Sequence, residues 1–254
     1  MRILFLVLVM ASQLVFAGDA KSKYGPKSAP KAISLAQDHQ YFQSGKHKAP
    51  DFWALAGFYV PQFNGAACSV ASMAMVLNAA RALLPKTADD KVVLQQELLD
   101  KLADTEHWKA RITSLTGYRG ARGLSLDGLG KVAEAAFKAY GFPAVSVQVV
   151  HAENTPEAKK ALIVALKKNE ESATDFMLTN FNQQAFTDDA DVGHIAPVAA
   201  YDAEKGRVLV MDPDREYYEP YWISVDTFLA GMSTGKDSES GKTRGYVVIH
   251  GSGI

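Results

Sequence analysis

The chain is poor in cysteine, with Cys68 as its single thiol among 254 residues. One cysteine forms no internal disulfide and supplies no cysteine-rich zinc or iron–sulfur site. An excess of one charge is also lacking, because 27 lysine and arginine residues are balanced by 28 acidic residues. A protein that binds nucleic acid phosphates through a broadly basic surface is therefore not expected. The composition predicts neither a nucleic acid partner nor a resident metal or cofactor.

An apolar run long enough to cross a membrane, about 20 residues, is missing. The chain begins with Met1 and Arg2, and residues 3–16 are apolar except for Ser12 and Gln13. This pattern predicts a signal peptide over residues 1–17, cleaved after Ala17. We therefore expect a periplasmic or secreted protein with no stable membrane association after cleavage.

Residues 18–50 contain scattered lysines and prolines and show little apolar periodicity. They predict a solvated arm laid over the folded part of the chain. Residues 51–254 then form one globular domain of ordinary size.

The domain predicts an α+β fold, with helices first and an antiparallel sheet afterwards. Residues 68–84 are apolar on nearly every side, which indicates a central buried helix that begins at Cys68. The short polar segment 202–206 joins two apolar runs, as a hairpin does. Further helices are expected at 89–103, 125–140 and from 156 onward, and strands at 144–150, 175–179, 194–201, 207–211, 217–223 and 246–250.

Cys68 has two interpretations. A lone cysteine is commonly an inert buried side chain. In an exported protein, however, an unpaired thiol is exposed to oxidation, and the dipole and free amides of a helix N-terminus favour its ionised form. Both features favour a thiolate nucleophile at Cys68.

A thiolate nucleophile needs a base and a group that orients this base. Among six histidines, His194 stands out because it follows Gly193 at the start of an apolar strand. Asp212 ends the strand that the hairpin pairs with the His194 strand. His194 is therefore the candidate base and Asp212 its candidate orienting group, although a structural role for either residue stays open.

Gln62 lies six residues before Cys68 and is the candidate oxyanion donor, together with the Cys68 backbone N–H. The order Gln62, Cys68, His194, Asp212 resembles papain-like cysteine peptidases. In that group the histidine follows the cysteine by about 130 to 150 residues, and here the interval is 126.

Three sequence blocks resemble the phytochelatin synthase family in its short bacterial form. They are PQFNGAACSVASMAMVLNA, then GHIAPVAAYD followed by VLVMDPDREYYEPYW, and finally TRGYVVI. The resemblance implies a papain-like fold in which Cys68 is the nucleophile, His194 the general base and acid, Asp212 the orienting group and Gln62 the oxyanion donor.

The same resemblance implies two substrate-binding residues. Arg215 matches an arginine linked to carboxylate recognition, and Asn180 matches a polar residue at the acyl site. The sequence departs from the family at Tyr217, where relatives often have lysine, and at Ala196, where they have serine. These departures concern recognition of the second substrate.

By resemblance, glutathione is the substrate, and the enzyme transfers its γ-glutamylcysteinyl group through a thioester to water or to a second glutathione. Metal ions would then enter as complexes with the thiolate of the substrate. Two alternatives remain open: a papain-like peptidase that trims exported peptides, and a non-catalytic binder of glutathione or thiol–metal complexes. Whether the protein forms a homodimer also stays open.

Overall fold

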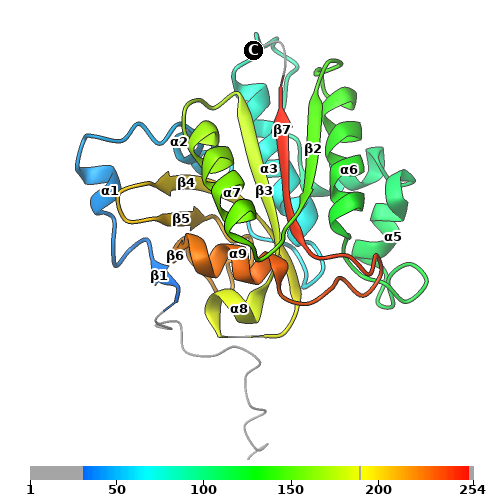
Figure 1. Ribbon diagram of the computed structural model, residues 1–254. Helices are drawn as coiled ribbons and strands as arrows, with labels where there is room; N and C mark the ends of the chain where they lie inside the picture. The colour runs from blue at the N-terminus through cyan, green and yellow to red at the C-terminus, as the bar shows by residue number, and fades with distance from the viewer. Residues whose placement is uncertain (1–30, 189, 252–254) are drawn as a thin grey trace, which may run out of the picture.

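An antiparallel sheet lies at the centre of the computed structural model, which describes residues 31–188 and 190–251. In these residues the strand order is β1-β6-β5-β4-β3-β7-β2 (Figure 1). The strands are β1 Ile33–Ser34, β2 Ser146–His151, β3 Asp175–Asn182, β4 Gly193–Asp202, β5 Arg207–Val210, β6 Tyr221–Ser224 and β7 Gly245–His250.

Helices cover both faces of this sheet (Figure 1). On β3, Phe176 and Leu178 join the core on the α3 side, whereas Met177 and Phe181 join the core under α7 and α9. This alternation follows from the two-residue period of a strand. The helices are α1 Gln40–Gln43, α2 Pro50–Ala56, α3 Cys68–Ala82, α4 Gln95–Lys101, the 3₁₀ helix η1 Thr105–His107, α5 Trp108–Thr113, α6 Leu126–Ala139, α7 Pro156–Asn169, α8 Gln183–Thr187 and α9 Val225–Ser233.

The α+β class and the buried helix at Cys68 are confirmed. Helix α3 begins at Cys68, and its residues from Cys68 to Ala80 are buried. The caps of two other predicted helices are present, since Ser125 accepts a hydrogen bond from Gly128 N and Thr155 accepts one from Ala158 N. The hairpin is also present, because β4 and β5 pair antiparallel.

Two predicted elements are shorter than expected. The helix predicted at 89–103 is reduced to α4, because the Asn78 side chain donates to Val93 O and accepts from Val93 N, both at 2.9 Å. The strand predicted at 217–223 begins only at Tyr221. Its first residues form a turn in which Asp214 O accepts from the N–H groups of Tyr217 and Tyr218.

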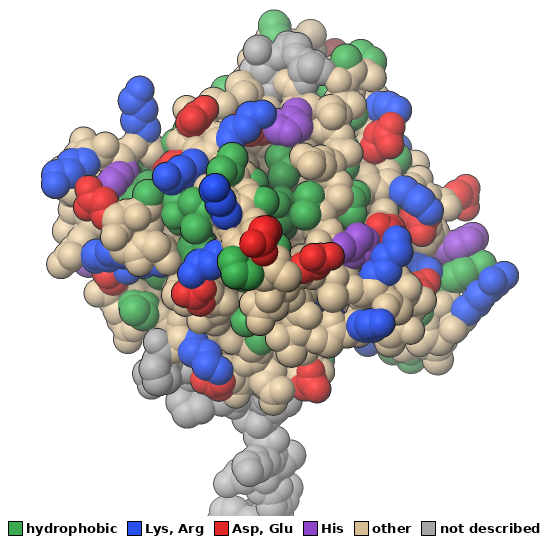
Figure 2. Space-filling view, in the orientation of Figure 1, with side chains coloured by type: hydrophobic (Ala, Val, Ile, Leu, Met, Phe, Trp, Pro, Cys, Tyr) green, Lys and Arg blue, Asp and Glu red, His purple; other side chains and the backbone are tan. Residues whose placement is uncertain are grey.

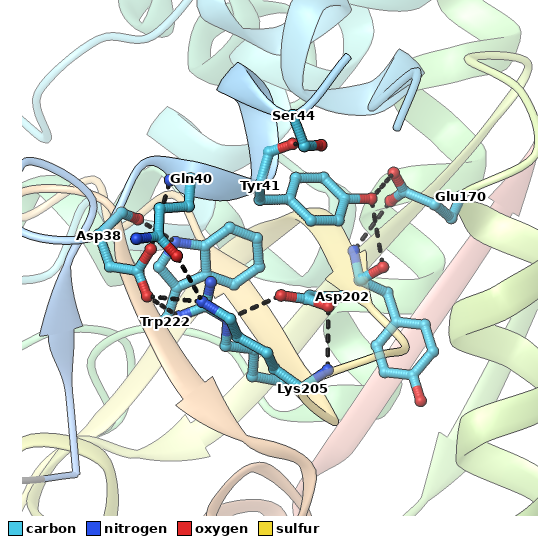
Figure 3. Close-up of polar contacts among 10 residues, drawn as sticks. Asp38, Gln40, Tyr41, Ser44, Glu170, Asp202, Lys205 and Trp222 are labelled. Carbon is cyan, nitrogen blue, oxygen red and sulfur yellow. Dashed lines mark hydrogen bonds and ion pairs between the residues drawn. The ribbon is translucent and has the colours of Figure 1, made fainter. Parts of the chain in front are cut away.

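The described part of the predicted arm, residues 31–50, belongs to the domain instead of lying solvated over it. Strand β1 pairs with β6, and Tyr41 is 4% exposed within the core. Figure 3 shows polar contacts that hold this segment, among them the contact of Tyr41 with Glu170. Tyr41 Oη donates to Glu170 at 2.6 Å, and Asp38 pairs with Arg207 at 2.6 Å. Side-chain pairing across a long interval, which local patterns do not reveal, brings the segment into the fold.

On the face drawn in Figure 2, basic and acidic side chains are interspersed. Within the described ranges, none of the helices has the length and hydropathy needed to span a bilayer. The predicted signal peptide at 1–17 and the start of the arm, residues 18–30, lie outside the described residues.

Candidate active site

Cys68 lies at the first position of α3, where the helix leaves its N-terminal amides uncapped by a side chain. The helix is anchored beside the histidine strand, because Ser72 Oγ donates to the Ile195 carbonyl at 3.0 Å. Trp108 Nε1 donates to Ser69 Oγ at 2.9 Å and secures the first turn. Buried hydrogen bonds therefore set the position of the thiol relative to β4.

His194 joins Cys68 and Asp212 into one chain of contacts. Its Nε2 lies 2.7 Å from Asp212 Oδ1, and its ring is also hydrogen-bonded to Cys68. Since Nε2 faces the carboxylate, Nδ1 is the nitrogen left for the thiol. The three residues predicted to act together, from segments far apart in the sequence, are thus adjacent.

Burial and charge have opposite effects on the pKa values of His194 and Asp212. Burial disfavours a charged imidazole, but the Asp212 carboxylate and the hydrogen bonds to Asp212 and Cys68 outweigh it and raise the pKa of His194 well above 6.5. Burial also works against ionised Asp212, yet the His194 charge and three hydrogen bonds lower the pKa of this carboxyl. The pair is therefore built to hold imidazolium beside carboxylate.

The Asp212 carboxylate is held on both oxygens. Oδ1 also accepts from Asp214 N at 2.9 Å, and Oδ2 accepts from Tyr221 Oη at 3.0 Å. The backbone carbonyl of Asp212 accepts from Tyr59 Oη at 2.6 Å. These contacts keep a fully buried carboxylate in one orientation.

Gln62 lies in the loop beside Asp212, since its N–H donates to the carbonyl of Pro213 at 2.8 Å. Its side-chain Oε1 is buried without a hydrogen-bond partner. Pairing of the backbone with Pro213 brings Gln62 close to the residue that follows Asp212, and its role as the oxyanion donor stays a prediction.

The two predicted substrate-binding residues occupy different environments. Arg215 is exposed, and its guanidinium lies 4.2 Å from the ring centroid of Tyr59, which contacts Asp212. Asn180 is 3% exposed and donates to the Leu124 carbonyl at 3.5 Å. It pairs on β3 with Ile195, the neighbour of His194. A ligand can therefore reach the Arg215 side chain from solvent, whereas the Asn180 side chain is buried within the fold.

Sequence reasoning missed Arg244 at this site. A Cβ added to Gly193 would lie 3.3 Å from Arg244 Nη2, so the guanidinium packs over the residue before His194. Arg244 Nε is buried and has no hydrogen-bond partner. An arginine directly before the closing strand was the available signal, and this side chain is suited to a carboxylate of a ligand.

A metal centre is not indicated by the described residues. Within residues 31–188 and 190–251, there is no group of three His, Cys, Asp or Glu side chains that could hold a metal ion. The chemistry that this arrangement can perform is nucleophilic attack by the Cys68 sulfur, with His194 as the proton carrier.

Known proteins with similar sequences bear the name glutathione γ-glutamylcysteinyltransferase. Glutathione γ-glutamylcysteinyltransferase 1 of Lotus japonicus is 25% identical over 236 residues, and the alignment covers 87% of this chain and 41% of that protein. Glutathione γ-glutamylcysteinyltransferase 1 of Arabidopsis thaliana is 29% identical over 73 residues, and the alignment covers 29% of this chain and 15% of that protein. The chain spans less than half the length of these relatives.

The comparison with protein families covers most of the chain. A model described as phytochelatin synthase matches residues 27–246, a range that includes Gln62, Cys68, His194 and Asp212. The match therefore extends over every element that positions the thiol, the imidazole and the carboxylate. This protein belongs to the phytochelatin synthase family.

Proposed function

We propose that this protein is a cysteine-dependent enzyme that releases glycine from glutathione through a γ-glutamylcysteinyl thioester on Cys68. One observation carries the proposal. Cys68 is hydrogen-bonded to His194, and His194 Nε2 lies 2.7 Å from Asp212 Oδ1. Membership in the phytochelatin synthase family and the names of the relatives support glutathione as the substrate.

In the first half-reaction His194 Nδ1 takes the proton of the Cys68 thiol. The sulfur then attacks the carbonyl carbon of the bond between cysteine and glycine in glutathione. The Cys68 backbone N–H and the Gln62 side-chain amide stabilise the negative oxygen of the tetrahedral intermediate. His194 returns the proton to the glycine nitrogen as the C–N bond breaks, so glycine leaves and a thioester remains.

In the second half-reaction His194 removes a proton from the attacking group. Attack by water gives γ-glutamylcysteine, and attack by the amine of a second glutathione gives a short phytochelatin. The C–S bond breaks, and the proton returns to Cys68. Asp212 holds the imidazole in the required orientation in both halves.

A papain-like arrangement is part of this proposal. A thiol at the start of a buried helix faces a histidine on an antiparallel sheet, and a side chain on the adjoining hairpin orients that histidine. This geometry and the order of the residues along the chain support the arrangement.

Two arginines would recognise the carboxylates of glutathione. Arg244 packs against Gly193, the residue before His194 in the sequence, and exposed Arg215 lies over Tyr59. Glutathione has two carboxylates at opposite ends, so two separated guanidinium groups fit its charge pattern.

Export of the protein also remains part of the proposal, on the basis of residues 1–17. Determination of the N-terminal residue of the protein recovered from the periplasm or the medium tests this point. A mature chain that begins at Gly18 is expected, and a chain that retains Met1 would contradict it.

Mass spectrometry of products formed from glutathione tests the activity. Glycine and γ-glutamylcysteine are expected with the wild type and should be absent with Cys68→Ala, and cadmium in parallel samples reports on metal–thiolate substrates. A panel of ordinary α-linked peptides should stay uncut. Wild-type turnover by Cys68→Ala, or cleavage of the panel in preference to glutathione, would overturn the proposal.

A further inference from the structure

Tyr221 contacts the carboxylate oxygen of Asp212 that His194 does not contact. It is 3% exposed on β6, and its hydroxyl is 3.0 Å from Asp212 Oδ2. A phenol has one proton, so the value of this contact depends on whether that proton points to Asp212 or elsewhere. The surrounding hydrogen bonds answer this question.

The orientation of the Gln183 amide, which lies next to Tyr221, follows from contacts inside α8, the short helix between β3 and β4. Thr187 Oγ1 donates its one proton to the Gln183 carbonyl at 3.0 Å, so it can only accept from the Gln183 side chain. Gln183 Nε2 lies 3.3 Å from this oxygen. The amide nitrogen of Gln183 therefore faces Thr187, which fixes the orientation of the amide group.

Burial and the neighbouring Asp212 carboxylate raise the pKa of the Tyr221 phenol well above its ordinary value, and a hydrogen bond with the Gln183 side chain opposes them. The oxygens of an ionised carboxylate only accept hydrogen bonds, so the contact of 3.0 Å to Oδ2 directs the one proton of Tyr221 to Asp212. The phenol oxygen is then left to accept from the Gln183 amide. Gln183 and Thr187 are 2% and 4% exposed, so water does not compete within this line of groups.

We propose that Tyr221 is a positioning residue of the thiol site, which donates its one proton to Asp212 Oδ2 and is aimed there by Gln183 and Thr187. The proposal rests on the proposed thiol chemistry. Tyr221 touches neither substrate nor sulfur and acts through Asp212. With Oδ2 occupied, the carboxylate presents Oδ1 to His194 and stays ionised although it is fully buried.

Other titratable groups interact with Tyr221, Asp212 or His194 and contribute to any pH profile measured at the site. They come from the loop before α3, from α3, from β4 and from the turn after Asp212. These groups are Tyr59, Cys68, His194, Asp214 and Tyr218. Tyr221→Phe leaves the identity of all these residues unchanged, so a comparison of this variant with the wild type isolates the effect of the hydroxyl.

Alkylation of Cys68 by iodoacetamide as a function of pH tests the proposal, since the chain has no other cysteine. In Tyr221→Phe the buried Oδ2 loses its donor, and the pKa of Asp212 rises. The acidic limb of the alkylation profile should then move upward by about one pH unit. Turnover of glutathione should fall about 10-fold at unchanged KM. The matched control is Tyr246→Phe on β7, which removes the hydroxyl of another buried tyrosine and should leave the profile unchanged.

Superimposable profiles of the wild type and folded Tyr221→Phe would overturn the proposal. If circular dichroism finds that Tyr221→Phe does not fold, Gln183→Met takes its place. That variant leaves the phenol but removes the group that aims it, so a smaller shift in the same direction is expected and an unshifted profile would overturn the proposal. A wild type that releases no glycine from glutathione would reject the proposed function, while the alkylation profiles would still decide the role of Tyr221.

Discussion

His194 Nε2 lies 2.7 Å from Asp212 Oδ1, and this contact determines which ring nitrogen faces Cys68. The carboxylate orients the imidazole and stabilises its charged form in one interaction. Every step assigned to His194 depends on it.

Asp212→Asn tests this contact directly. An amide carries no charge to stabilise imidazolium and can impose the wrong tautomer, so kcat for glycine release should fall by about 100-fold or more. Steady-state kinetics with glutathione measures the loss. Exposed Asp104→Asn provides the matched control, and an Asp212→Asn enzyme with wild-type kcat would contradict the role of this pair.

Arg244→Met removes the guanidinium that packs against Gly193 and leaves a side chain of similar length. Loss of a charge-assisted hydrogen bond to a carboxylate should raise KM for glutathione about 10-fold. Alkylation of Cys68 by neutral iodoacetamide should change little, because that reagent has no carboxylate. An unaltered KM would argue against a role of Arg244 in substrate binding.

Asp38→Asn should destabilise the protein and remove part of its acid sensitivity. The hydrogen bond from Arg207 lowers the pKa of Asp38 from 3.8 to about 2. This carboxylate therefore contributes stability above about pH 4 that is lost as the pH falls toward 2. At pH 7 we expect a loss of about 1 kcal/mol in the free energy of unfolding, or about 2–4 °C in Tm.

The control for Asp38 is Lys31→Met, which breaks the contact to Asp188 between two half-exposed side chains. Such exposed pairs contribute between about 0 and 1 kcal/mol. Urea unfolding at several pH values distinguishes the two variants. Equal stability of Asp38→Asn and the wild type at pH 7 would show that the Asp38–Arg207 pair does not hold the N-terminal segment.

Asp51→Asn should stabilise the protein at neutral and higher pH. Asp51 is fully buried, and burial, with Asp175 and Glu170 nearby, raises its pKa well above 3.8. A raised folded-state pKa contributes stability below about pH 4 that is lost as the pH rises through the folded value. Asparagine removes this loss and can donate to the Asn169 Oδ1 atom, which has no hydrogen-bond partner.

Thermal unfolding between pH 4 and pH 8 measures the effect of Asp51→Asn. The variant should match the wild type near pH 4 and exceed its Tm by several degrees at pH 8. A lower Tm of the variant at pH 8 would show that Asp51 is ionised in the folded protein and stabilised by a partner.

Local patterns in the sequence were sufficient for the elements that carry the nucleophile and its base. A run that is apolar on every side predicted buried α3 with Cys68 at its start, and the polar turn 202–206 predicted the hairpin that brings Asp212 to His194. Both patterns are local, since helix periodicity and turn residues act over a few positions.

Local sequence patterns gave wrong predictions where side chains that are distant in the sequence decide the structure. The backbone of Val93 is bound by the Asn78 side chain, which prevents the predicted helix there. Asp38 pairs with Arg207 across the sequence and draws residues 31–50 into the domain. In both cases a specific side chain from another segment outweighed local propensity.

By itself the sequence determined the α+β class, the nucleophile helix, the candidate triad and the resemblance to a family. Only the tertiary structure decided that His194 presents Nδ1 to the thiol, that Tyr221 donates to Asp212, and that Arg244 lies over Gly193. The physical reason is that hydrogen-bond direction and close packing depend on atoms from separate strands and helices. Their positions are set by burial of both faces of the sheet, which periodicity along the chain does not describe.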